Sequence, residues 1–162
     1  MSTTSKTGTT TFETPTDLEI RATRAFRAPR ELVFEAWTSP EHLPHWMTGP
    51  PGWTMPVCEI DLRPGGAWRF VWRKEDGAEM EMTGVYDEIL RPERVVNTES
   101  WGGDWPDTLN TLVLTEADGY TTAVMTTLYP TLEARDLALG SGMKEGMTVS
   151  FDRLEAHLSS LA

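Results

Sequence analysis

An alternation of apolar and polar residues with a period of two dominates the middle of the chain and predicts a β-sheet. The first alternating segment covers residues 18–26. Six further strands are predicted between residues 55 and 129, where short turn sequences that contain Gly, at 63–66, 76–77 and 118–119, separate the alternating runs. Because no long helical segment interrupts these strands, we expect an antiparallel meander and about seven strands in all.

Helical spacing of apolar residues predicts helices on both sides of this sheet region. Pro29 suits the first position of one helix, and Ser39-Pro40 starts a second, short helix that Pro44 limits. Near the end of the chain, apolar residues at steps of three and four predict a long amphipathic helix over residues 143–161. This order of elements predicts an α+β layout in which a twisted antiparallel sheet wraps around the long C-terminal helix.

The composition divides the chain of 162 residues into a tail and one domain. Residues 1–16 are mostly Thr and Ser and cannot bury enough apolar surface to offset the entropy of ordering, so we expect a disordered tail. Residues 17–162 are enough for one domain with a core of its own. The single cysteine, Cys58, excludes an internal disulfide framework and favours a reducing cytoplasm as the location.

Charge and motifs exclude several classes of partner. The formal net charge of −11 argues against nucleic acid or an anionic membrane, because binding to phosphates relies on clustered Lys and Arg. No apolar run approaches the roughly 18 residues of a membrane span, and no signal-peptide pattern is present. The chain has no phosphate-binding glycine loop and no nucleophile motif, so no cofactor is expected.

The histidines raise the question of a metal site. His42 and His45 are three residues apart on the predicted short helix, so one ion could contact both. A zinc site needs one or two further ligands, and the other candidates, Cys58 and His157, are distant in the sequence. The sequence therefore favours partly solvated helix histidines and predicts no metal site.

Aromatic residues and methionines supply the candidate ligand-binding residues. The chain has seven Trp, more than one core of this size usually needs, and large aromatic side chains often line small-molecule pockets. Gly146 lacks a side chain beside Met143 and Met147, so the start of the C-terminal helix is expected to form a pocket wall. The candidate residues are Trp46, Trp53, Trp72, Met82, Trp101, Met143, Gly146 and Met147.

Two sets of alternating residues concern the same predicted cavity. Trp68, Phe70 and Trp72 share one face of a strand, and whether that face meets the helix stays open. Glu99 shares a strand face with Val95, Asn97 and Trp101. A carboxylate in such surroundings can have a raised pKa and act as an acid or a base, so Glu99 is the first catalytic candidate and Tyr86 the second.

Four separated segments resemble the bacterial Hsp90-ATPase-activator-homologue-like proteins of the START-like superfamily. They are RAFRAPRELVFEAWTSPEHLPHWM, LRPGGAWRF, GVYDEILRPERVVNTESW and GMKEGMTVSFDRLEAHL, and together they extend over nearly all of residues 18–158. The resemblance implies a helix-grip fold (START-like or Bet v1-like), in which a curved antiparallel sheet grips a long C-terminal helix with a cavity between them. The superfamily includes lipid carriers, hormone receptors and polyketide cyclases, so the fold alone does not assign an activity.

Three functions follow from these observations. The first is binding of a small hydrophobic or aromatic molecule in the cavity, with residues 39–53 at its mouth and Trp53 controlling entry. The second is an enzyme of the polyketide cyclase, dehydratase or hydrolase type that uses the same cavity and Glu99. The third is a co-chaperone that binds Hsp90. It is less expected, because the eukaryotic activator has a separate N-terminal domain where this chain has only a Thr-rich segment before Leu18. The ligand and the oligomeric state are not predicted.

Overall fold

The computed structural model describes residues 9–48, 51–102 and 106–161, and over these residues eight strands and four helices follow one another. Residues 1–8 of the predicted tail lie outside this description. In chain order the elements are β1 (Thr11–Glu13), β2 (Glu19–Phe26), α1 (Arg30–Thr38), α2 (Leu43–Trp46), β3 (Trp53–Ile60), β4 (Ala67–Lys74), β5 (Glu79–Leu90), β6 (Arg94–Glu99), β7 (Thr108–Ala117), β8 (Tyr120–Leu128), α3 (Leu132–Leu139) and α4 (Met143–Leu161).

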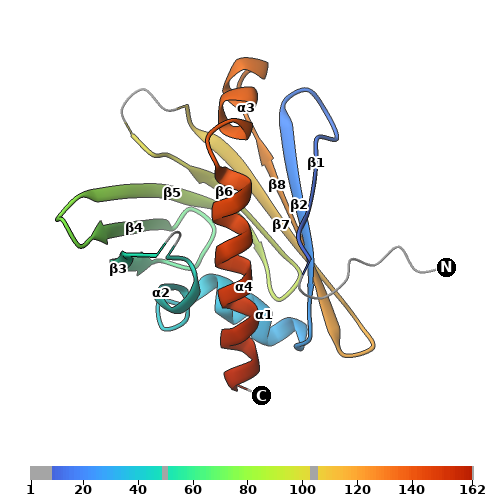
Figure 1. Ribbon diagram of the computed structural model, residues 1–162. Helices are drawn as coiled ribbons and strands as arrows, with labels where there is room; N and C mark the ends of the chain where they lie inside the picture. Colours follow the sequence, from blue (N-terminus) through green and yellow to red (C-terminus); the bar gives the residue numbers. More distant parts are fainter. Residues whose placement is uncertain (1–8, 49–50, 103–105, 162) are drawn as a thin grey trace.

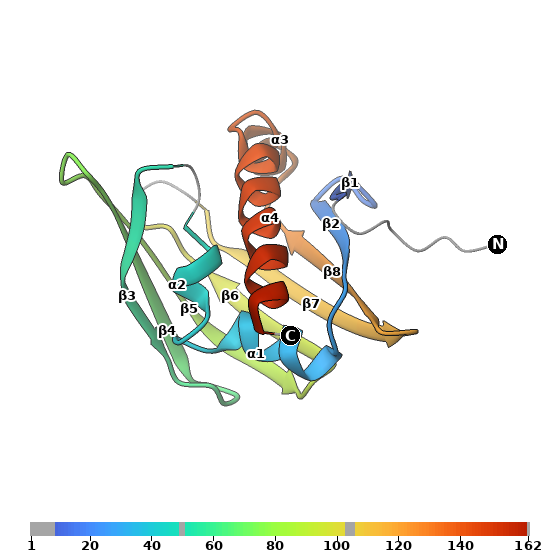
Figure 2. The same cartoon turned by 60° about the horizontal axis from the view of Figure 1, so that its bottom comes forward.

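All of these strands join one antiparallel sheet in the order β1-β2-β8-β7-β6-β5-β4-β3. From β3 to β8 each strand pairs with the next one in the sequence, and β2 pairs with β8. The sheet curves around α4, while α1 and α2 lie beside the C-terminal end of that helix (Figures 1 and 2). The predicted α+β helix-grip fold and its six-strand meander are therefore confirmed.

Strand β1 corrects the predicted boundary of the tail. The composition places Thr11–Glu13 in a disordered segment, but Phe12 pairs with Ala22 of β2 and packs against the core. The ammonium group of Lys144 lies 5.8 Å from the centroid of the Phe12 ring, so α4 also contacts this strand. One apolar residue among threonines is enough to add an eighth, short strand at the edge of the sheet.

The two helices after β2 begin later than predicted. Pro29 precedes α1 as its N-cap, and the helix starts at Arg30. Ser39-Pro40 forms a turn instead of starting a helix, and the Glu41 N–H donates to the Ser39 hydroxyl over 3.2 Å. The second helix starts only at Leu43, with Pro44 in its first turn, where a missing N–H costs no hydrogen bond.

The core lies between the concave face of the sheet and the helices α1, α2 and α4. Phe26 of β2, Phe34 of α1 and Trp46 of α2 are fully buried. On α4 the buried residues are Ser150, Phe151, Leu154 and Leu158, so the C-terminal half of the helix packs as predicted while Leu161 at its end is 44% exposed. Glycine ends α3, and α4 begins after Gly142, which has a φ of +83°.

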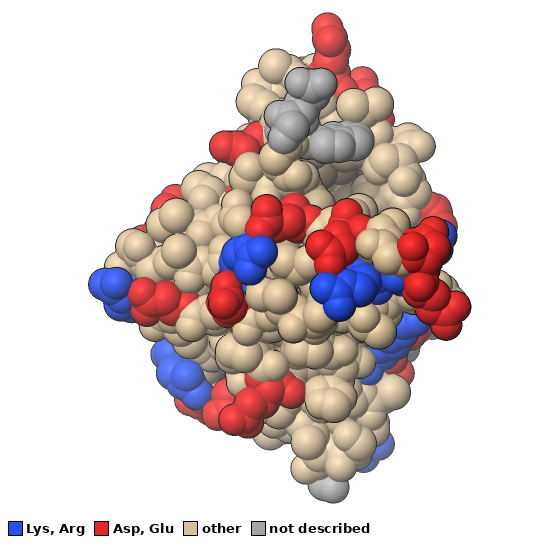
Figure 3. Space-filling model, turned by 90° about the vertical axis from the view of Figure 1, so that its left-hand side faces the viewer, with Lys and Arg blue, Asp and Glu red and all other residues tan. Residues whose placement is uncertain are grey.

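The outer face of β3, β4 and β5 is charged and solvated. Arg69 of β4 lies between Glu59 of β3, at 3.6 Å, and Glu81 of β5, with which it forms a hydrogen-bonded ion pair. Arg73 and Glu79 form a second cross-strand pair at 2.7 Å. Basic and acidic side chains alternate over this side of the molecule (Figure 3). Exposed pairs of this kind contribute little stability, typically about 0–1 kcal/mol each.

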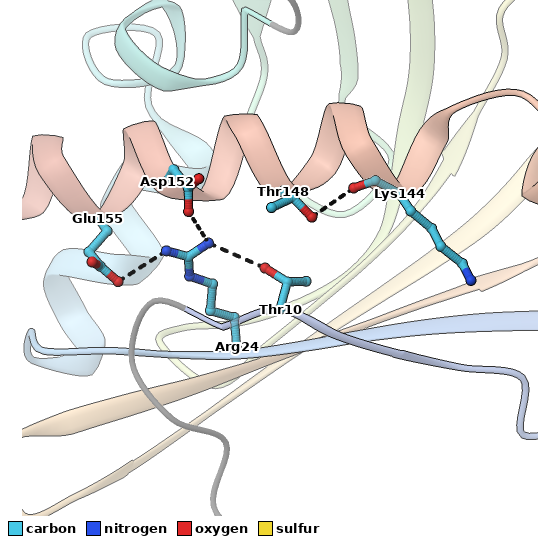
Figure 4. Close-up of polar contacts among 6 residues, drawn as sticks. All are labelled: Thr10, Arg24, Lys144, Thr148, Asp152 and Glu155. Carbon is cyan, nitrogen blue, oxygen red and sulfur yellow. Dashed lines mark hydrogen bonds and ion pairs between the residues drawn. The ribbon is translucent and has the colours of Figure 1, made fainter.

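A buried arginine joins the sheet to α4. Arg24 of β2 is 1% exposed, and its guanidinium lies 2.8 Å from Asp152 and 3.1 Å from Glu155, both on α4 (Figure 4). The same guanidinium donates to the Thr10 hydroxyl over 3.2 Å. One side of α4 is thus held by ionic contacts and the other by the apolar core. None of the helices in the described ranges is both long and apolar enough to cross a membrane.

Candidate functional site

A partly enclosed cavity of about 80 Å³ lies between the concave face of the sheet and the segment that contains α1 and α2. Four aromatic residues contribute to its wall. Trp68 and Phe70 alternate on β4 and point to this face, with their ring centroids 4.7 Å apart. Tyr86 of β5 and Trp37 of α1 add two more rings. This answers the question left open by the sequence, because the face of β4 with Trp68 and Phe70 is the inner one.

Three methionines complete the apolar wall. Met47 follows α2, Met82 lies on β5 and Met125 lies on β8, so the three side chains enter the cavity from different directions. Methionine is unbranched and adopts several conformations at low cost, so walls of this kind adapt to what they contain. Met82 is a predicted ligand-binding residue that the structure places at the cavity.

The polar part of the cavity is formed by side chains of β6 and β7. The strand register pairs Asn97 with Asn110 and Glu99 with Thr108. Asn110 Nδ2 donates to Glu99 Oε1 over 2.6 Å, and Trp101 Nε1 donates to Glu99 Oε2 over 2.8 Å. Asn110 Oδ1 in turn accepts a hydrogen bond from the hydroxyl of Thr127 on β8, over 2.8 Å. The half-buried carboxylate therefore sits in an ordered polar network at the edge of an apolar cavity.

Burial controls the ionisation of this cluster. It raises the pKa of Glu99, and the hydrogen bonds from Asn110 and Trp101 oppose that shift because they stabilise the carboxylate. Burial, followed by the charge of Glu99, raises the pKa of Tyr129 to about 12. Tyr86, the second catalytic candidate, also lines the cavity, and burial raises the pKa of its hydroxyl above the ordinary range. Glu99 is the candidate for proton transfer here. Burial raises the pKa of a carboxyl group toward neutral pH, whereas it raises the pKa of a tyrosine hydroxyl further above neutral pH.

Replacing Glu99 by Gln is expected to change how stability depends on pH. Since the pKa of Glu99 is raised in the folded state, the folded protein binds more protons than the unfolded one above about pH 4.3, the pKa of an unperturbed Glu. The wild type should therefore lose stability relative to Glu99→Gln as the pH rises through this window. Urea unfolding of both proteins between pH 4 and 8 measures the two stabilities. If the free energy of unfolding of the wild type stays constant or increases relative to that of Glu99→Gln as the pH rises, the burial of this carboxyl is contradicted.

Two predicted ligand-binding tryptophans are structural. Trp46 is fully buried and donates from Nε1 to the Ala36 carbonyl over 2.9 Å. Trp72 donates to the Met47 carbonyl over 2.7 Å and stacks on Trp101, with centroids 5.6 Å apart. These contacts attach α1, α2 and β4 to one another, and neither side chain lines the cavity. Trp101 is 38% exposed and reaches the site through its bond to Glu99.

The remaining predicted residues lie away from the cavity wall. Nothing lies within 4 Å of the position that a Gly146 Cβ would occupy, so the expected open space exists there, but neither this residue nor Met143 and Met147 lines the cavity. The reason is that the cavity lies against the end of α1 and Met47, whereas α4 packs mainly through its C-terminal half. Trp53 is half-buried against the core, and residues 49–50 of the predicted entry loop lie outside the described residues.

Sequence reasoning missed the helical wall of the cavity. Trp37 and Thr38 at the end of α1 line it, together with Met47. Helical spacing marks Trp37 as buried, but periodicity alone does not separate a core position from a cavity position. The segment 39–53 does reach the cavity as predicted, through Met47 and not through its tryptophans.

All three histidines of the chain meet at one place. His42 Nδ1 and His157 Nε2 are 2.9 Å apart, and the His45 ring stacks on His157 with centroids 5.0 Å apart. Burial lowers the pKa of His157, and the two neighbouring histidines lower it further. In the described part of the chain, no group of three or more His, Cys, Asp or Glu side chains is arranged to hold a metal ion. The cluster joins α2 to the end of α4. This contact could not be predicted from the sequence, because His157 lies far from His42 and His45 along the chain.

Cys58 lies on β3 and is half-buried. Burial raises the pKa of its thiol to about 11, so the thiol stays protonated near neutral pH. Because the thiolate is the nucleophilic form, this residue is not an activated nucleophile.

Comparison with known proteins agrees with this fold. A family model described as "Activator of Hsp90 ATPase homolog 1-like protein" matches residues 27–159. A crystal structure of a protein from Rhodobacter sphaeroides is 30% identical, with a TM-score of 0.89, and the match covers 95% of this chain and 100% of that one. A protein from Mycobacterium smegmatis is 25% identical (TM-score 0.81, 93% and 97% covered) and one from Nitrosomonas europaea 24% identical (0.81, 91% and 97%). A search of the curated proteins found no match.

Proposed function

Since the chain belongs to the family of activator of Hsp90 ATPase homolog 1-like proteins, we propose that it uses the cavity of this fold to bind a small hydrophobic or aromatic molecule. The observation that carries the proposal is the composition of the cavity wall. Aromatic rings and methionines form about half of it, Val95 and Leu112 add apolar surface, and its polar part is mainly an ordered cluster around Glu99. Small-molecule sites have this character, since apolar walls supply affinity and a few polar groups fix orientation.

The size of the cavity limits the ligand. About 80 Å³ is well below the roughly 300–1,000 Å³ of pockets that hold drug-sized molecules. An engineered apolar cavity of about 150 Å³ in another protein is enough to hold benzene. Because the cavity is smaller than that, even a single ring fits only when Met47, Met82 and Met125 change conformation, and we propose a ligand of this size.

A thermal-shift screen with neutral one-ring aromatic compounds tests this proposal. A compound at 100 times its dissociation constant adds about 2.7 kcal/mol, which for a chain of this size raises Tm by roughly 5–11 °C. Leu112→Phe places a larger side chain in the cavity wall and is expected to abolish the rise, whereas Leu109→Phe, a residue of the same strand that does not line the cavity, should retain it. If no compound raises Tm, or if Leu112→Phe responds like the wild type, the proposal is wrong.

Glu99 supports a second candidate, in which the bound molecule is also converted. A half-buried carboxyl with a raised pKa at the edge of an apolar cavity is suited to general acid or base work, as a cyclase, dehydratase or hydrolase requires. Incubation of a thermal-shift hit with the wild type and with Glu99→Gln separates the two candidates. A product that forms only with the wild type favours the enzyme, and recovery of unchanged compound from both favours a binding protein.

A further inference from the structure

Two indole N–H groups at the cavity have no acceptor. Trp37 of α1 is 8% exposed and Trp68 of β4 is 4% exposed, and both rings line the cavity. The Nε1 atom of each is buried, and neither has a hydrogen-bond partner among the described residues. Native proteins pair roughly nine in ten or more of their buried polar groups, and a buried donor left unpaired costs about 1–3 kcal/mol. These two donors therefore require an explanation.

The other tryptophans show that this is a local property of the cavity. Trp46 donates to the Ala36 carbonyl and Trp72 to the Met47 carbonyl, at 2.9 and 2.7 Å. Trp101 donates to the Glu99 carboxylate at 2.8 Å. The fold thus supplies acceptors to three indoles outside the cavity wall and none to the two indoles that form it.

We propose that the cavity recognises a neutral aromatic carbonyl compound, whose oxygens accept hydrogen bonds from Trp37 Nε1 and Trp68 Nε1. The proposal rests on the proposed ligand binding and specifies its chemical class. One donor belongs to the helical wall and the other to the sheet, so a ligand needs two acceptor oxygens to pair both. Indole N–H groups donate only, and they therefore select for acceptors on the ligand.

The polar cluster explains why the ligand is neutral. Glu99 lines the same cavity, so a ligand carboxylate would bring a second negative charge into a poorly solvated space. Like charges at close range in such surroundings repel strongly. A ketone, aldehyde or quinone offers acceptor oxygens without that repulsion. A pure hydrocarbon fits the apolar wall but leaves both indole donors unpaired.

A matched pair of probes tests the inference. 1,4-Diacetylbenzene carries two carbonyl groups, and 1,4-diisopropylbenzene has nearly the same shape without acceptors. Trp68→Phe and Trp37→Phe keep an aromatic ring but remove the N–H. Each substitution is expected to weaken diacetylbenzene binding about 5- to 10-fold, the effect of one hydrogen bond, and to leave binding of the hydrocarbon unchanged. Titration calorimetry measures both affinities, and equal losses for the two probes overturn the inference.

The wild-type protein gives a second readout that does not depend on the folding of a variant. In proton–nitrogen NMR spectra, diacetylbenzene should shift the indole N–H signals of Trp37 and Trp68 downfield. The signals of Trp46 and Trp72, which have internal acceptors, are the controls and should stay in place. If the probe binds without moving the first two signals, the carbonyl inference is wrong and the proposed binding function stands. If neither probe binds at all, both are wrong.

Discussion

Replacing Gly84 by alanine is expected to lower the free energy of unfolding by about 3 kcal/mol or more. A Cβ at this position of β5 would lie 2.0 Å from the Thr98 carbonyl oxygen and 2.4 Å from Cζ2 of Trp68. The first is backbone and the second belongs to a buried ring, so neither is the flexible end of a side chain. The added methyl group must displace β6 or push Trp68 out of the cavity wall. Urea unfolding measures the change.

Gly146→Ala is the matched control for this substitution. Nothing lies within 4 Å of the added methyl group, and the residue lies inside α4, where alanine is favoured over glycine by roughly 0.5–1 kcal/mol. This variant should therefore be slightly more stable than the wild type. Similar effects of the two alanines would contradict the argument that Trp68 rests directly on the backbone of β5.

The second large effect is expected from Asp152→Asn combined with Glu155→Gln. The double variant leaves Arg24, 1% exposed, without a counterion, and breaking a buried ion pair from one side typically costs about 3–5 kcal/mol. Arg24 would keep only the Thr10 hydroxyl and the ring of Phe26, whose centroid is 5.5 Å away. Each single substitution should cost less, because the other carboxylate remains in place. Chemical unfolding of the three variants measures this coupling.

Arg24→Met removes the buried charge itself and serves as the control. The side chains of Asp152 and Glu155 are 59% and 37% exposed, so water can solvate them once the arginine is gone. Methionine fills much of the same space with apolar atoms. We therefore expect Arg24→Met to cost less than the double neutralisation. The opposite order would show that these contacts act as ordinary surface ion pairs.

Much of the fold was predictable because local patterns determine it. Short turn sequences, most of them with glycine, separate six alternating segments, and neighbouring antiparallel strands with short connections have few alternative pairings. The errors lie where local signals are weak. In β1 a single apolar residue, Phe12, marks a strand of three residues. At Ser39-Pro40 the capping pattern is that of a helix, yet the chain makes a turn and the helix begins at Leu43.

The site was only partly predictable, since it depends on how helices are placed on the sheet. Alternation along β6 placed Glu99 on one face with Val95 and Asn97, and all three line the cavity, as do the candidates Met82 and Tyr86 of β5. Which helical residues face them depends on contacts between segments far apart in the sequence. Trp37 thus reached the cavity, whereas the predicted Met143 did not, because α4 packs mainly through its other half. Likewise, no local pattern indicates that His157 meets His42.

Methionine methyl NMR tests the central claim, that the cavity receives the ligand, most directly. The chain has eight methionines, and three of them, Met47, Met82 and Met125, line the cavity. During titration of the methyl-labelled wild type with 1,4-diacetylbenzene, these three signals should shift together with one dissociation constant, while Met80, which is 44% exposed, and Met143 should not move. Shifts confined to Met80 or Met143 would place the probe outside the cavity, and no saturable shift at any methionine would contradict cavity binding altogether.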